Sequence, residues 1–404
     1  MLRLSQLAPE VRQYLLVTAN YWAFTLTDGA LRMLVVLHFY QLGYSPLQIA
    51  LLFVFYEFFG VVTNLTGGWL GARIGLNRTM NIGLGLQLLA LAMLLVPAAW
   101  LTVVWVMAAQ ALSGIAKDLN KMSAKSAIKT LVPAAAGGRL YQWVALLTGS
   151  KNALKGVGFF MGGVLLAWLG FKGAVGAMML LLAAVWLLSL IRLQGDLGRV
   201  SGKPAFTDMF SSNKAINVLA AARLFLFGAR DVWFVVALPV YLVASLNWPQ
   251  AQVGSFLALW VIGYGMVQAL APRLTSRGQR VPGRTAVLLW GSLLVGVPLL
   301  MAVGLGQQWN PELVLMAGLA LFGVVFAINS SLHSFLIVSF ARADGASLDV
   351  GFYYMANAAG RLLGTVLSGW VYQQYGFAAC LWVSALLLLV AVLISIGLPR
   401  PATR

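Results

Sequence analysis

The chain has 404 residues, of which 61% are hydrophobic and 9% are charged, whereas a soluble domain has roughly 45–50% apolar and about 25% charged residues. This composition excludes a water-soluble fold. The net charge of +17 would suggest nucleic acid as the partner of a soluble protein, but in a membrane chain we expect no nucleic-acid partner. The single cysteine, Cys380, excludes a disulfide framework and a thiolate metal cluster.

Twelve long apolar runs follow one another along the chain, and a helix of about 20 apolar residues crosses a bilayer. The average of about 34 residues for each run and its connection (404 divided by twelve) leaves nothing for a separate catalytic domain. We therefore expect an all-α polytopic membrane protein that is not an enzyme. The predicted spans are 14–40, 46–72, 79–98, 101–128, 140–169, 173–191, 216–243, 250–272, 285–305, 312–340, 348–375 and 377–398.

Basic residues outside the spans gather on one side of the predicted membrane. Connections between successive spans lie alternately on the two sides of the membrane. Seventeen of these residues lie in the two termini and in the connections on their side, whereas the connections on the other side contain only Lys172. Cytoplasmic loops carry the excess of Lys and Arg. We therefore expect a multi-pass membrane protein with both termini in the cytoplasm.

The longest polar break, from about Arg192 to Asn213, separates the first six spans from the last six. It predicts an N-terminal bundle (1–191), a cytoplasmic linker (192–215) and a C-terminal bundle (216–404). The halves also repeat: Asp28 and Pro46 are 18 residues apart, as are Asp231 and Pro249. At an offset of 206, Lys155 aligns with Arg361, and Gly170 aligns with Gly376. Parallel repeats of this kind are typical of several transporter folds.

Charged residues inside the spans are the main functional signal, because each costs roughly 2.5–3.5 kcal/mol at the centre of a lipid-facing helix. Nine are basic and four are acidic, which leaves five uncompensated positive charges. They must face water, partners or a ligand, and a cavity with this excess favours a polyanionic substrate. The basic residues are Arg32, Lys117, Lys121, Lys125, Lys151, Lys155, Arg223, Arg230 and Arg361; the acidic residues are Asp28, Glu57, Asp118 and Asp231.

The fourth span carries a basic stripe, since Lys117, Lys121 and Lys125 recur every four residues and so stay within about 80° on a helix. This stripe is a candidate substrate path. The alternative is that Lys125 extends to the cytoplasmic headgroups while Asp118 holds Lys121 in place.

The remaining intramembrane charges have alternative interpretations too. Lys155 and its repeat counterpart Arg361 are a candidate anion clamp, with Lys151 one helical turn away, although Arg361 could instead pair with Glu57. Asp28 and Arg32 have the spacing of an intrahelical pair. Arg230 and Asp231 are neighbours in sequence and are not expected to share a helix face, so each is a separate cavity candidate.

The segment from Gly68 to Arg78 (GWLGARIGLNR) resembles the loop motif of the major facilitator superfamily, G-x-L-x-D-R-x-G-R-[RK]. The glycines and Arg73 match the motif, but Ala72 stands where the motif has an aspartate. The charge contact between the two halves that is attributed to this aspartate is therefore not expected in this chain. The resemblance implies twelve helices in two six-helix pseudo-repeats, with alternating access at a central site. The chain contains no nucleotide-binding loop, so we expect a secondary transporter without cofactors.

Three further segments, 20–33, 114–125 and 228–234, resemble the ArsJ family of bacterial organoarsenical efflux permeases. This resemblance implies export of 1-arseno-3-phosphoglycerate, which a neighbouring glyceraldehyde-3-phosphate dehydrogenase makes, and hence arsenate resistance. It also implies a place in the bacterial inner membrane. We expect the chain to act as a monomer. The alternative is an organophosphate or phosphate anion exchanger of the same fold, whereas an exporter of lipophilic cations would need an acidic cavity.

The charge pattern and the two resemblances together give a set of candidate site residues. The candidates for substrate binding are Lys117, Lys121, Lys125, Lys151, Lys155, Arg230, Arg361 and Arg32. The candidates for coupling or gating are Asp28, Glu57 and Asp231.

Overall fold

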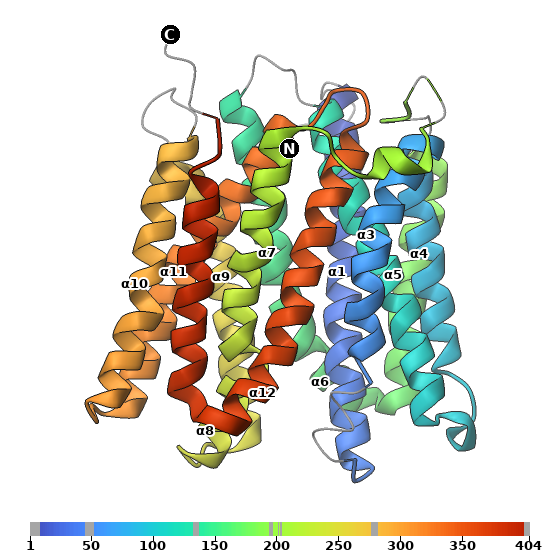
Figure 1. The fold of residues 1–404 in the computed structure, drawn as a ribbon. Helices are drawn as coiled ribbons and strands as arrows, with labels where there is room; N and C mark the ends of the chain where they lie inside the picture. The colour runs from blue at the N-terminus through green and yellow to red at the C-terminus, as the bar shows by residue number, and fades with distance from the viewer. Residues whose placement is uncertain are drawn as a thin grey trace. The chain divides into compact units, whose positions relative to one another are not determined.

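The computed structural model describes residues 9–44, 52–131, 137–193, 197–200, 202, 204–275 and 282–399. Within these ranges the chain is helical and contains no strand (Figure 1). Both chain termini and Pro46 lie outside the described residues, as does part of the predicted linker.

The predicted spans are each found as helices, with ends that differ by a few residues where both ends are described. The seventh span comprises α7 and α8, the fifth and sixth lie in α6, and the last two lie in α12. The long helices are α1 (Pro9–Gln41), α3 (Val54–Ile74), α4 (Leu76–Met93), α5 (Val103–Leu131), α6 (Gly137–Arg192), α7 (Lys214–Phe234), α8 (Ala237–Ala244), α9 (Gln250–Thr275), α10 (Arg284–Gly306), α11 (Pro311–Phe340) and α12 (Ala346–Ser395).

Judged by length and composition, six helical stretches of the described residues are long and apolar enough to cross a membrane. They are Gly138–Arg192, Lys214–Ala244, Gln252–Thr275, Arg284–Gly306, Pro311–Phe340 and Ala346–Ser395. The first and last of these contain two predicted spans each.

Single glycines divide α6 and α12. Gly170 has φ 66° and ψ 179°, and Gly376 has φ 79° and ψ −177°. This region of positive φ with extended ψ is essentially restricted to glycine. The sequence repeat aligns these two residues, so the same rare backbone conformation recurs at equivalent positions in the two halves.

The chain forms two compact units. Unit 1 comprises Met1–Leu140, Ser150–Phe210 and Ala341–Met355; unit 2 comprises Tyr141–Gly149, Ser211–Phe340 and Ala356–Arg404. Both α6 and α12 therefore contribute to both units. The division into 1–191, 192–215 and 216–404 stays a prediction.

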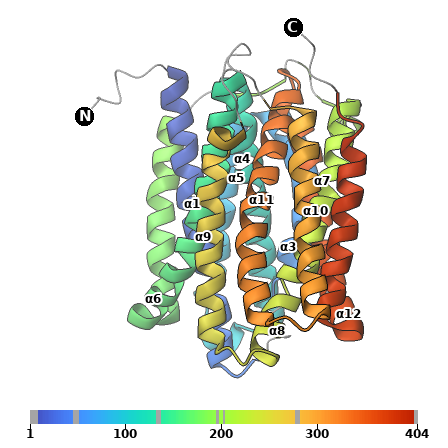
Figure 2. The same cartoon turned by 90° about the vertical axis from the view of Figure 1, so that its left-hand side faces the viewer.

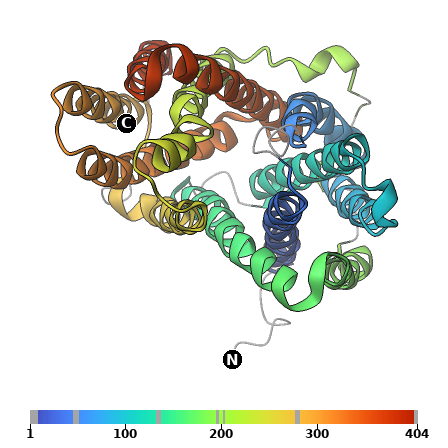
Figure 3. The same cartoon turned by 90° about the horizontal axis from the view of Figure 1, so that it is seen from below.

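In unit 1, α5 is the central helix and packs against α1, α3 and α4; Figure 3 shows these helices nearly end-on. Small residues permit close crossings. A Cβ atom added at Gly114 would lie 2.6 Å from the carbonyl oxygen of Tyr56, so α5 touches the backbone of α3 there. This contact places the polar face of α5 beside Tyr56.

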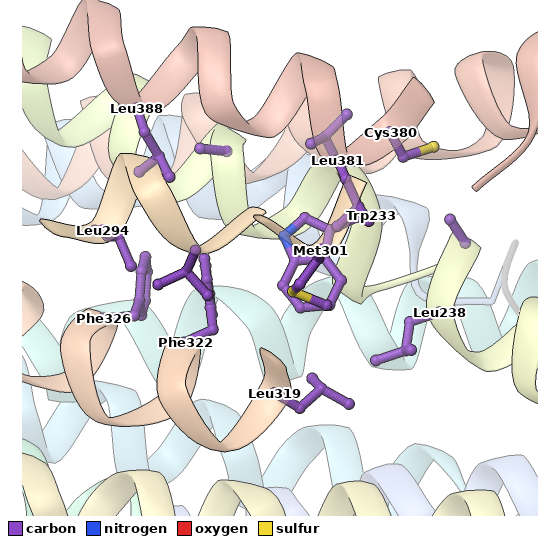
Figure 4. Packing of buried hydrophobic residues seen from close by; sticks show 14 of the residues in the cluster. Trp233, Leu238, Leu294, Met301, Leu319, Phe322, Phe326, Cys380, Leu381 and Leu388 are labelled. Atoms are coloured by element: carbon purple, nitrogen blue, oxygen red, sulfur yellow. The ribbon is translucent and has the colours of Figure 1, made fainter. Parts of the chain in front are cut away.

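Unit 2 has the equivalent arrangement around α11, which packs against α7, α9 and α10; α10 and α11 run side by side in Figure 2. Its core is aromatic and aliphatic (Figure 4). Trp233 and Phe322 meet edge to face with ring centroids 5.0 Å apart, and Cys380 is buried in the same cluster. This core fixes α7, which carries Arg223, Arg230 and Asp231.

The segment that resembles the loop motif joins α3 to α4 through Gly75, whose φ is 93°. Residues of the linker satisfy the backbone groups that the two helix ends leave open. The amide of Val200 donates to Ala72 (2.9 Å), and the amide of Leu76 donates to Leu197 (2.8 Å). The linker thus pairs with the backbone on either side of Gly75, at Ala72 and at Leu76.

Candidate functional site

Lysines of α5 surround a buried carboxylate in unit 1. Lys121 donates to Asp118, and Lys117 Nζ lies 3.7 Å from Asp118 Oδ2. The Asp118 side chain is 2% exposed, and each of these lysine side chains is 13% exposed. The predicted role of Asp118 in holding Lys121 is confirmed. One carboxylate between two ammonium groups leaves this stripe with a positive excess.

Tyrosine rings from α3 and α12 cover the same lysines. Lys117 Nζ lies 3.8 Å from the ring centroid of Tyr56, while Lys121 and Lys125 lie 4.9 and 5.2 Å from that of Tyr354. Lys125 is only 3% exposed, so the prediction that it extends to the headgroups is wrong. Tyr354 holds it inside unit 1, because a desolvated cation is stabilised over an aromatic face.

Asp28 and Arg32 of α1 take partners on α3. The Tyr56 hydroxyl lies 2.7 and 3.0 Å from the two oxygens of the buried Asp28 carboxylate, to which it donates. Arg32 Nη1 lies 3.6 Å from Glu57 Oε1, and its guanidinium lies over the Phe53 ring. The predicted intrahelical pair is therefore wrong, because side chains of α3 approach both residues.

Lys151 and Lys155 lie on α6. Lys151 donates to Asn152, and Lys155 Nζ lies 6.0 Å from the ring centroid of Phe159. The backbone of Lys155 packs against Gly29, since a Cβ atom at Gly29 would lie 2.7 Å from the Lys155 carbonyl oxygen. These two lysines thus belong to unit 1 where α6 crosses α1, next to Asp28, while the stripe of lysines lies on α5.

The unit 1 cluster is the set of charged residues that α1, α3 and α5 bring together. It contains four cations and three carboxylates: Arg32, Lys117, Lys121, Lys125, Asp28, Glu57 and Asp118. All three carboxylates already accept a hydrogen bond or form an ion pair within it. An anion entering the cluster would therefore meet a net positive environment.

In unit 2 a single carboxylate faces two guanidinium groups. Arg230 pairs with one oxygen of Asp231, and Arg361 Nε lies 3.2 Å from the other. The Asp231 side chain is fully buried. The expectation that Arg230 and Asp231 are separate candidates is wrong, because the long Arg230 side chain reaches the carboxylate of its neighbour although the two residues do not share a helix face.

Arg223 is a third guanidinium of this group, and the candidate site list omitted it. It is 3% exposed, donates to Asn357 Oδ1 (2.8 Å) and lies over the Phe227 ring at 4.0 Å. Arg230 lies over the same ring at 4.8 Å. The spacing of seven residues between Arg223 and Arg230 was the signal that could have found it, since such residues share a helix face.

The unit 2 cluster therefore consists of Arg223, Arg230, Arg361 and Asp231. Guanidinium groups bind phosphate and carboxylate through two parallel hydrogen bonds. Among the described residues, no group of three or more histidine, cysteine or acidic side chains could hold a metal ion. The chemistry that these two clusters offer is the binding of anions.

Comparisons with known proteins agree with this architecture. The family model described as Major Facilitator Superfamily matches residues 219–404. The human organic anion transporter MFSD10 (TETRAN) superposes with a TM-score of 0.77 at 17% identity, over 96% of this chain and 100% of that chain. No curated protein matches significantly by sequence.

Two further structures have the same fold. A bacterial homologue of the iron transporter ferroportin in its outward-facing state gives a TM-score of 0.74 at 14% identity, over 95% of this chain and 98% of that chain. The major facilitator transporter FucP in its outward conformation gives a TM-score of 0.71 at 12% identity, over 96% of this chain and 99% of that chain. The chain therefore has the major facilitator fold that the sequence resemblance predicts.

Proposed function

We propose that this chain is a secondary active transporter of the major facilitator superfamily that exports an organic oxyanion from the bacterial cytoplasm. The observation that supports the proposal best is the charge of the two buried clusters. In each, cationic side chains outnumber the carboxylates and lie over aromatic rings. A polyanion supplies the missing negative charge, whereas a cation would add to the repulsion.

Each cluster by itself offers donors for an anionic group. The unit 1 cluster offers mainly ammonium groups, which act as mobile point charges, and the unit 2 cluster offers guanidinium groups with their fixed fork of donors. Lys151 and Lys155 add two positive charges to unit 1 where α6 crosses α1.

The sequence resemblance to the organoarsenical permeases suggests the substrate 1-arseno-3-phosphoglycerate. This compound carries a phosphate at one end and an arsenate at the other. Its export, followed by hydrolysis outside the cell, would confer arsenate resistance. The chain would then depend on a glyceraldehyde-3-phosphate dehydrogenase that makes the substrate. A transporter of trivalent arsenite would need several thiolates, and this sequence has one cysteine.

The carboxylates Asp28, Glu57 and Asp231 are the proposed coupling or gating groups. Glu57 contacts Arg32 and Asp231 contacts Arg361, whereas Asp28 accepts from Tyr56, whose ring lies over Lys117. Binding of an anion to these cations would compete with the carboxylates. Such competition links the occupancy of the site to the charge state of the acids.

The test is arsenate sensitivity and cellular arsenic content in an efflux-deficient bacterium that expresses this chain with and without the dehydrogenase. Resistance with lowered arsenic content only when both are present is the expected result. Lys121→Gln should abolish export while the protein still inserts in the membrane. Lys172→Gln is the matched control, because Lys172 is exposed and lies outside both clusters.

No effect of the wild-type protein on either readout, with the protein present in the membrane, would contradict the organoarsenical substrate. The next experiment would then be counterflow in vesicles. Uptake of a phosphate ester stimulated by an internal counter-anion would identify an organophosphate exchanger. Normal export by Lys121→Gln would contradict the assignment of the binding residues.

A further inference from the structure

One face of α1 is polar over most of the length of a membrane-spanning helix. Six polar residues recur at alternating spacings of four and three, which keeps them on one side of a helix. Over eighteen residues the stripe extends about 27 Å, close to the roughly 30 Å of a bilayer's hydrocarbon core. Five of the six are at most 5% exposed, and the sixth is Arg32. The members are Tyr14, Thr18, Tyr21, Thr25, Asp28 and Arg32.

The polar stripe faces the interior of unit 1. Asp28 meets Tyr56 of α3, Arg32 meets Glu57 of the same helix, and α1 packs against α5, the helix of the lysines. The stripe and the lysines therefore belong to the same polar interior.

Tyr21 lies near the middle of the stripe. Its side chain is 1% exposed, and its hydroxyl makes no hydrogen bond within the described part of the chain. Two buried tyrosines differ from it in this respect, since the Tyr56 hydroxyl donates to Asp28 and the Tyr141 hydroxyl lies 2.9 Å from Thr275 Oγ1. Buried polar groups are rarely left without a partner, and an exception calls for a specific explanation.

The position of Tyr21 on α1 points to a ligand as that explanation. Tyr21 lies two helical turns before Asp28 on the same face of the helix. Asp28 accepts a hydrogen bond from Tyr56, and the Tyr56 ring lies over Lys117 of α5. Since α1 also packs against α5, Tyr21 faces the same polar interior as the lysines.

We propose that Tyr21 donates its phenolic hydroxyl to an oxygen of the tetrahedral oxyanion that the unit 1 cluster binds. This inference rests on the proposed function. The lysines supply the charge that attracts a phosphate or arsenate ester. A neutral hydroxyl at a fixed position adds direction, because it favours an oxygen at one place and distance. Tyr21 is therefore a specificity-determining residue of the site.

The experiment uses the purified full-length protein and 3-phosphoglycerate as a stable probe. Binding is measured by calorimetry, and thermal unfolding is measured without ligand. Tyr21→Phe should weaken binding by about tenfold, as the loss of one hydrogen bond to a charged acceptor implies. Its Tm without ligand should stay unchanged or rise, because the variant removes a buried hydroxyl that has no partner.

Tyr141→Phe is the matched control. It also removes a buried hydroxyl, but one with a partner in unit 2 and outside both clusters. The control should lower the Tm and leave probe binding unchanged.

Three outcomes would contradict the proposal in different ways. If the wild type binds the probe and Tyr21→Phe binds it equally well, Tyr21 does not contact the oxyanion, and the proposed function stands. If Tyr21→Phe lowers the Tm without ligand as Tyr141→Phe does, the hydroxyl is structural. If the wild type neither binds the probe nor lowers cellular arsenic, the proposed function fails, and this inference fails with it.

Discussion

Arg361 Nε of α12 lies 3.2 Å from Asp231 Oδ2 of α7, while Arg230 pairs with the other oxygen of the same carboxylate. Two guanidinium groups therefore share one negative charge. Because Asp231 is fully buried, water screens this arrangement little, and the charge excess of unit 2 is concentrated at one place.

Replacing this shared carboxylate should be costly. We expect Asp231→Asn to destabilise the protein by about 3–5 kcal/mol, the usual range when one partner of a buried ion pair is removed. Thermal unfolding in detergent measures the effect. Asp344→Asn is the control, because Asp344 is exposed. Equal Tm values for the two variants would show that Asp231 does not hold the arginines together.

The unit 1 cluster allows a chemical rescue. Asp118→Asn leaves Lys117 and Lys121 without the carboxylate between them, so the variant should unfold at lower temperature. A small oxyanion can take the place of that carboxylate. We expect sulfate to raise the Tm of Asp118→Asn more than that of the wild type, with chloride at the same ionic strength as the control. Equal sulfate effects on both proteins would argue against an anion site at these lysines.

The crossing of α3 with the first turns of α12 in unit 1 depends on glycine. A Cβ atom at Gly68 would lie 2.5 Å from the carbonyl oxygen of Ser347 and 3.0 Å from Gly351 Cα. Gly68→Ala should therefore lower the Tm, because backbone atoms must move apart. Gly176→Ala is the control, since no atom lies within 4 Å of its Cβ position, and alanine favours a helix by about 1 kcal/mol. A Tm for Gly68→Ala at or above that of the control would contradict the close crossing.

Gly170 and Gly376, the glycines that divide α6 and α12, should respond alike to substitution. Gly170→Ala and Gly376→Ala place a side chain in a strained backbone conformation, which costs on the order of 1–3 kcal/mol. Nothing lies within 4 Å of either Cβ position, so strain alone sets the effect. Gly369→Ala, at an open position without positive φ, should be neutral or stabilising. Clearly different losses of stability for Gly170→Ala and Gly376→Ala would contradict the structural equivalence of the two glycines.

The sequence predicts the helices of this chain well, because length and hydropathy decide which segments cross a bilayer. The lysine stripe also follows from sequence, since Lys117, Lys121 and Lys125 keep one helix face. The partners of these lysines do not, because Tyr56 and Tyr354 come from distant parts of the chain. Side-chain flexibility explains the errors at Arg230 and Lys125, whose long side chains reach groups that helix geometry alone does not reveal.

The turns at Gly170 and Gly376 also constrain how the topology of this protein can be mapped. A single residue joins the helical segments on either side of each turn. Such a turn offers no loop for a protease to cut or an antibody to bind, and an epitope inserted there would force the helices apart. Reporter fusions and accessibility tags therefore belong in a longer connection, such as the one between α6 and α7, away from the pairing residues Leu197 and Val200.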